Sequence, residues 1–107
     1  MLAHSVYFTL RDRTAETAAI LVASCREHLT DHPGEIAFAA GTLADYDREV
    51  NDRDWDVFLL IVFASHEAHD AYQTSPRHQE FIAANATSCA KVRVFDSELA
   101  AWQAGDA

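Results

Sequence analysis

The stretch Asp56-Val-Phe-Leu-Leu-Ile-Val-Phe63 contains an unbroken run of seven apolar residues and is typical of a β-strand over residues 57–63. Successive side chains of a strand point to opposite faces of the sheet. Val57, Leu59, Ile61 and Phe63 therefore share one face, and the residues between them share the other. A strand that is apolar on both faces is covered on both faces in the folded protein.

The flanking sequence predicts five further elements around this strand. Alternation predicts strands, helical spacing of apolar residues predicts helices, and Thr14, Ser65 and Ser75 can cap helices. The predicted elements are strand 3–10, helix 14–29, strand 35–42, strand 57–63, a helix from 65 through 72 that restarts at 76 and runs to about 86, and strand 91–95. This order is the split βαβ pattern of a ferredoxin-like α+β sandwich, βαββαβ. Residues 45–56 carry six acids and two arginines and are predicted to form a solvated loop.

Two helices can cover only one face of a four-stranded sheet. The chain has no further element large enough to cover the second face, where Phe58, Leu60 and Val62 point. An exposed apolar face of this size promotes aggregation. We therefore expect a homodimer in which two sheets pack face to face about a two-fold axis.

The segment Tyr72-Gln-Thr-Ser-Pro76-Arg-His78 contains a candidate acid/base pair. Pro76 cannot lie inside a helix but fits its first turn directly after a capping serine. His78 then lies in the first turn, where the helix dipole favours the neutral imidazole, which can accept a proton. Tyr72 lies within reach just upstream. The alternative interpretation is a Tyr and a His on the flank of a core helix.

Composition narrows the class of protein. The chain has 107 residues, enough for one domain, with a core over about 3–98 and a tail over 99–107. A net charge of −9 argues against nucleic acid and against an anionic membrane surface. We find no 18-residue apolar run, no secretory leader and no Cys-x-x-Cys pair, and we expect a cytoplasmic protein with buried thiols.

The remaining histidines are candidates for metal ligands. His66 and His69 are spaced i, i+3, and His28 and His32 are spaced i, i+4. A catalytic metal site needs about three converging ligands, and the sequence names no third partner for either pair. We therefore interpret them as solvated surface histidines and predict no metal site.

The chain resembles the stress-responsive dimeric α/β-barrel (Dabb) family. The resemblance runs from residue 3 to about 98 and rests on the order and spacing of several short pieces. These are Ala3–Leu10, Pro33–Ile36, Val57–Ala68, Ala71–Phe81 and Val92–Asp96. It implies a ferredoxin-like subunit that dimerises through its sheet, forming a dimeric α/β barrel, with a pocket between sheet and helices.

Some members of the wider family are cofactor-free polyketide cyclases, which implies a small organic ligand and catalytic roles for Tyr72 and His78. The resemblance also places His4 in the pocket, although a core histidine held by one hydrogen bond is an equal alternative. The predicted ligand-binding residues are His4, Val6, Phe8, Leu59 and Ile61. The alternative function is a non-catalytic, stress-related ligand-binding or interaction protein.

Overall fold

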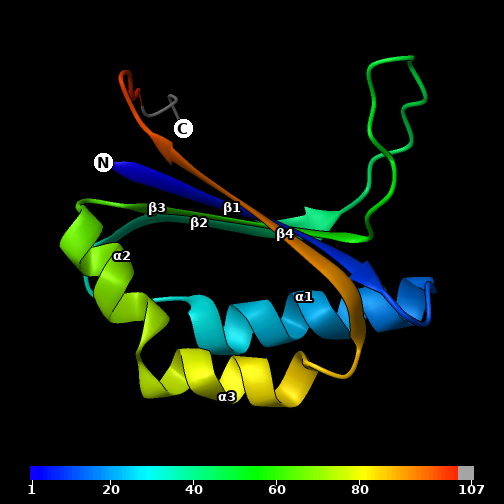
Figure 1. The fold of residues 1–107 in the computed structure, drawn as a ribbon, viewed down its shortest axis with the longest axis horizontal. Coiled ribbons are helices and arrows are strands. Elements are labelled where there is room, and N and C mark those ends of the chain that lie inside the picture. The colour runs from blue at the N-terminus through cyan, green and yellow to red at the C-terminus, as the bar shows by residue number, and fades with distance from the viewer. Residues whose placement is uncertain (104–107) are drawn as a thin grey trace.

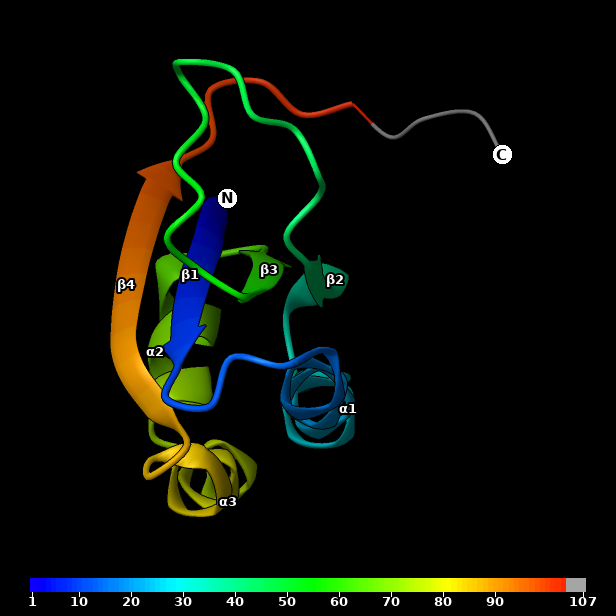
Figure 2. The same ribbon diagram turned by 90° about the vertical axis from the view of Figure 1, so that its right-hand side faces the viewer.

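One antiparallel sheet forms a single layer, and three helices lie against one of its faces (Figures 1 and 2). The computed structural model describes residues 1–103. Its elements are β1 (Leu2–Leu10), α1 (Ala15–Leu29), β2 (Glu35–Thr42), β3 (Val57–Phe63), α2 (His66–Gln73), α3 (Pro76–Asn85) and β4 (Cys89–Glu98). The four strands lie in the order β2-β3-β1-β4. The predicted ferredoxin-like α+β fold is confirmed.

The predicted capping residues begin all three helices. The Thr14 side chain accepts from the backbone N–H of Thr17, whose hydroxyl in turn accepts from the Thr14 N–H. Ser65 caps α2. The Ser75 hydroxyl accepts from the backbone N–H of His78 at 3.2 Å, with Pro76 in the first turn of α3. These side chains satisfy N–H groups that a helix cannot pair internally.

The core lies between the sheet and the helices. Its strand residues come mainly from β1 and β3, and those of β3 are the four residues predicted for the inner face. The buried residues of α1 are Ala18, Leu21, Cys25 and Leu29. The neighbouring Val22 is partly buried against them. Burial of these side chains is the main favourable term in folding.

One strand differs in length from the prediction. β4 extends over Cys89–Glu98 rather than 91–95, because it pairs with β1 along its whole length, from Leu10 opposite Cys89 to Leu2 opposite Glu98. β2 has the predicted bounds, and its register with β3 shifts between Glu35 and Ala37, where Ile36 is 44% exposed.

The outer face of the sheet is partly covered by the segment 43–56, which contains the residues 45–56 that were predicted to form a solvated loop. Asp54 accepts from Lys91 at 2.8 Å and Asp52 from Arg93 at 3.0 Å, so two acids of the segment are tied to β4. The Trp55 ring packs edge-on against Tyr7, with centroids 5.0 Å apart. The acids of this segment therefore hold it against the sheet.

No helix within residues 1–103 combines the length and the apolarity needed to cross a membrane. The described part of the predicted tail, residues 99–103, contains no helical turn, and the rest of the tail, 104–107, lies outside the described residues.

Candidate active site

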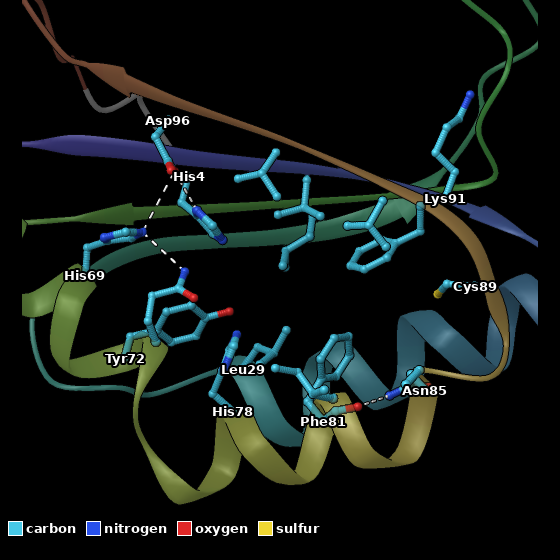
Figure 3. A pocket seen from close by; sticks show the side chains of 18 of the residues that line it. His4, Leu29, His69, Tyr72, His78, Phe81, Asn85, Cys89, Lys91 and Asp96 are labelled. Carbon is cyan, nitrogen blue, oxygen red and sulfur yellow. Dashed lines mark hydrogen bonds and ion pairs between the residues drawn. The ribbon is translucent and has the colours of Figure 1, made fainter.

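A cavity of about 670 Å³ lies between the inner face of the sheet and helices α2 and α3 (Figure 3). Its wall is mostly apolar, with contributions from β1, β3, α1, α3 and β4. These apolar lining residues include Val6, Phe8, Leu29, Leu59, Phe81, Ile82, Val92 and Val94. Ile82, Val92 and Val94 are 45–50% exposed, so the cavity opens between α3 and β4. His4, His69, Tyr72, His78 and Asp96 gather at one end, near α2, whereas Asn85 and Lys91 lie at the other end (Figure 3).

Tyr72 lies near the end of α2, only 2% exposed, with its hydroxyl directed into the cavity (Figure 3). Aromatic rings surround it: its ring centroid lies 4.8 Å from that of His78, 4.9 Å from His32 and 5.1 Å from Phe63. Burial raises the pKa of Tyr72, because a phenolate would be poorly solvated there. The hydroxyl is therefore protonated at neutral pH and can donate a hydrogen bond.

His78 lies in the first turn of α3, in the orientation that the Ser75 cap gives that turn. Burial is the main cause that lowers the pKa of His78, and the nearby His4 and His32 lower it further. The positive end of the helix dipole acts in the same direction. Its Nδ1 is buried without a well-formed hydrogen bond among residues 1–103. The lowered pKa keeps the imidazole neutral at pH 7, so it can accept a proton, although a backbone contact with Gln73 opposes part of the shift.

His4 projects from β1 into the polar end of the cavity, and its Nδ1 lies 2.6 Å from Oδ1 of Asp96 on β4. Burial lowers the pKa of His4, and the Asp96 carboxylate opposes this shift. Sequence reasoning gave Asp96 no role, because the predicted fourth strand ended one residue earlier. The alternation Val92, Val94, Asp96 placed all three on one face and was the pattern that could have found it.

The predicted site residues fall into two groups. Tyr72, His78, His4, Val6, Phe8 and Leu59 all line the cavity. Ile61 does not line it; this residue is fully buried in the core. Its expected place in the pocket is corrected, because α2 and the core side chains cover that part of β3.

Two histidines also differ from their predicted surface positions. His69 lines the cavity with 14% of its side chain exposed, one helical turn before Tyr72. His32 is buried: its Nε2 donates to the backbone carbonyl of His28 at 2.8 Å, and its ring packs on Tyr72. His66 is exposed as predicted and pairs with Glu98. The i, i+3 spacing of His69 and Tyr72 was the pattern that could have placed His69 at the site.

The model of the family described as Stress Responsive A/B Barrel Domain matches residues 2–99. The chain belongs to the Dabb family. No curated protein matches this chain in sequence.

Solved structures share the fold of this Dabb domain. A dimeric ferredoxin-like protein of unknown function from Jannaschia sp. CCS1 is 24% identical, with 92% of this chain and 98% of that chain covered and a TM-score of 0.74. A Dabb family protein from Mesorhizobium loti is 19% identical, with coverages of 94% and 97% and a TM-score of 0.76. A hydroxynitrile lyase from Passiflora edulis is 18% identical, with coverages of 95% and 96% and a TM-score of 0.73. At these identities the likeness concerns the fold.

Proposed function

We propose that this Dabb domain binds a small, largely apolar organic molecule and performs acid/base chemistry on it. The observation that carries the proposal is the placement of Tyr72 and His78, with ring centroids 4.8 Å apart, on one cavity of about 670 Å³. Cavities of roughly 300–1,000 Å³ with mostly apolar walls and a few polar groups are typical ligand sites. The hydroxynitrile lyase with this fold supports the view that the fold accommodates small-molecule chemistry.

In this proposal His78 removes a proton from an acidic C–H or O–H group, and Tyr72 donates a hydrogen bond to the oxygen that becomes negative. The directions of the two pKa shifts support these roles. A lowered pKa keeps His78 neutral and able to accept a proton, and a raised pKa keeps Tyr72 protonated and able to donate. His4, held by Asp96, orients the bound molecule at the same end of the cavity.

We also propose that the domain forms a homodimer through the outer face of its sheet. Phe58 and Leu60 on this face are only half-buried in the single chain, and Phe95 is 51% exposed. The Jannaschia protein with the same fold is described as dimeric, which supports this arrangement. A second sheet packed on this face would cover the apolar side chains that segment 43–56 leaves open.

Hydrogen–deuterium exchange of small carbon acids tests the acid/base proposal without knowledge of the natural substrate. A panel of 1,3-dicarbonyl and phenolic compounds is first ranked by thermal shift, since a ligand that binds the folded state raises its melting temperature. Proton NMR in D2O then follows loss of the acidic C–H signal with and without the protein. His78→Ala is expected to lower the protein-dependent rate about 100-fold, as for loss of a general base.

Tyr72→Phe is expected to lower the rate less, because the ring remains and only a donor is lost. His66→Gln is the matched control, since it removes an exposed histidine of α2 that lies outside the cavity. Compounds that bind but exchange no faster with the protein than without it would overturn the catalytic proposal. That outcome would favour the alternative of a ligand-binding protein.

A further inference from the structure

The polar end of the cavity brings together three potential metal ligands from three different elements. They are His4 on β1, His69 on α2 and Asp96 on β4, and all three line the cavity (Figure 3). Nδ1 of His4 lies 2.6 Å and Nε2 of His69 lies 3.8 Å from the same oxygen, Oδ1 of Asp96. The three ligand atoms all lie within 4.8 Å of one another.

The neighbours of His69 orient its ring as metal-bound histidines are oriented. Its Nδ1 lies 3.2 Å from Oδ1 of Asp70, and a carboxylate only accepts, so Nδ1 carries the proton. Its Nε2 then bears the acceptor lone pair, to which the Gln73 amide nitrogen donates at 3.3 Å, so a cation that binds Nε2 takes the place of the Gln73 amide. At protein metal sites a carboxylate commonly accepts from the ring N–H of a ligating histidine that faces away from the metal, which fixes the orientation of the ring.

This orientation leaves two electron-rich atoms facing each other, the lone pair of His69 Nε2 and Oδ1 of Asp96. Among the described residues, the Nδ1–H group of His4 is the only hydrogen-bond donor to Oδ1 of Asp96. A cation between the nitrogen and the oxygen would bind both atoms, in place of the amide hydrogen that Gln73 offers to the nitrogen. The site is also shielded: the His4 and His69 side chains are 5% and 14% exposed, whereas Asp96 at 40% leaves a path for an ion to enter.

We propose that His4 Nδ1, His69 Nε2 and Asp96 Oδ1 form a binding site for a divalent transition-metal ion, with Zn²⁺ as the reference ion. Bonds of about 2.0–2.2 Å in a tetrahedral site place neighbouring ligand atoms roughly 3.3 Å apart. The observed 2.6 and 3.8 Å lie on either side of this value, so small side-chain rotations form the site. The His4 ring then carries its proton on Nε2.

The ligand set determines which ions fit. Two imidazoles and one carboxylate suit Zn²⁺, Co²⁺ or Fe²⁺, whereas Mg²⁺ and Ca²⁺ prefer sites made of oxygen ligands. Three protein ligands leave at least one coordination position open, as in catalytic zinc sites. Because all three ligands line the cavity, this position faces the bound molecule. The sequence names no third partner for His69, because His4 and Asp96 come from β1 and β4 rather than from the same helix.

Binding of Co²⁺ to the full chain, without an affinity tag and after removal of metal by a chelator, tests the proposal. Co²⁺ reports its coordination through visible d–d absorption, and calorimetry with ZnCl₂ gives the stoichiometry and Kd. One ion per chain is expected, with an intense, tetrahedral-type cobalt spectrum. MgCl₂ should not compete.

Variants identify the ligands. His69→Gln and Asp96→Asn should each abolish the cobalt spectrum and weaken Zn²⁺ binding beyond the roughly 10–100-fold that loss of an orienting neighbour costs. Asp70→Asn, a change at an exposed side chain, should weaken binding roughly 10-fold by freeing the His69 ring. His66→Gln is the matched control, since it removes a histidine of the same helix outside the cavity.

Circular dichroism in metal-free buffer checks that each variant is folded. The site does not exist if Co²⁺ and Zn²⁺ fail to bind, if Asp96→Asn leaves the affinity unchanged, or if His66→Gln weakens binding as much as His69→Gln. This measurement needs no substrate, so its result is independent of the exchange experiment that tests the acid/base function.

Discussion

The rings of Tyr72 and His78 lie 4.8 Å apart between centroids, at an interplanar angle of 66°, although the residues belong to different helices. In one continuous helix, residues six apart lie roughly 240° apart around the axis and about 9 Å along it, so their rings would not meet. The break at Ser75-Pro76 turns the chain so that the first turn of α3 lies beside the end of α2 (Figure 1). The helix break is therefore what builds the candidate acid/base pair.

The Ser75 cap should contribute both to stability and to the placement of His78. Ser75→Ala removes the hydroxyl that accepts from the His78 N–H, and we expect a loss of about 1 kcal/mol in the free energy of unfolding. Chemical denaturation measures this loss. Ser65→Ala is the matched control, because Ser65 caps α2 in the same way. It should cost similar stability while leaving the His78 ring resonances unchanged, whereas Ser75→Ala should shift them. Equal stability of Ser75→Ala and the native chain would contradict the prediction.

His78 should titrate below its ordinary pKa of 6.5, because burial disfavours the imidazolium and His4, His32 and His69 add positive charge nearby as they protonate. The chemical shift of its ring protons, followed from pH 8 to pH 4, measures the midpoint. His78→Gln assigns the resonance. A midpoint above 6.5 would show that a negative group dominates the environment of His78 and would count against its role as a neutral base.

The lowered pKa of His78 also makes the stability of the folded chain depend on pH. As the pH falls through the ordinary pKa, the unfolded chain binds a proton at His78 that the folded chain does not yet bind. The contribution of His78 to the free energy of unfolding is therefore unchanged at higher pH and becomes unfavourable as the pH falls below about 6.5. In His78→Gln, denaturation curves at pH 7.5 and pH 5.5 should differ less than those of the native chain. An unchanged pH dependence would contradict the lowered pKa.

The local features of this site were predictable from the sequence, whereas its long-range contacts were not. A serine before a proline is a local pattern, and it located the start of α3 and the placement of His78. Asp96 was missed because the extent of β4 depends on its pairing with β1, which is distant along the chain: Leu10 lies opposite Cys89 and Leu2 lies opposite Glu98. A prediction from the sequence ends a strand where the residues become polar. In the folded protein, hydrogen bonds to a partner strand can extend the strand beyond that point.

His69 and the segment 43–56 illustrate the same limit. The residues around His69 are polar, and its i, i+3 spacing to Tyr72 shows only that the two share a side of α2. The packing of α2 against β3 is what turns that side toward the cavity. Asp52 and Asp54 of segment 43–56 were predicted to be solvated because their partners, Arg93 and Lys91, come from the distant strand β4. Charge patterning along one segment does not show which distant cations will pair with it.

Gly34 should be required for the packing of α2 that positions Tyr72. Its φ of +82° is disfavoured for other residues, and a Cβ at this position would lie 2.4 Å from Cβ of Ala68 on α2. Gly34→Ala should therefore lower the free energy of unfolding by about 2 kcal/mol or more, from backbone strain and overpacking together. Gly41→Ala is the matched control, because its added Cβ meets no atom within 4 Å. Adding Ala68→Gly to Gly34→Ala should recover part of the loss, and failure to recover any would exclude the contact with α2 as a cause.

The outer face of β3 provides the sharpest test of the proposed homodimer. Of its three apolar residues, Val62 is already 2% exposed in the single chain, so Phe58 and Leu60 are the side chains left for a partner to cover. Leu60→Asp would place a carboxylate in that apolar contact, and burying an unpaired charge costs several kcal/mol. We expect the dimer Kd to rise by about 100-fold or more, measured by sedimentation equilibrium. Ile20→Asp is the control, because Ile20 is 61% exposed and belongs to α1, which packs on the other face of the sheet (Figure 1). A native chain that is monomeric at micromolar concentration, or equal weakening by both substitutions, would show that the sheet face is not the interface. In the latter case the effect of Leu60→Asp would reflect a general response to added negative charge on a chain whose net charge is already −9.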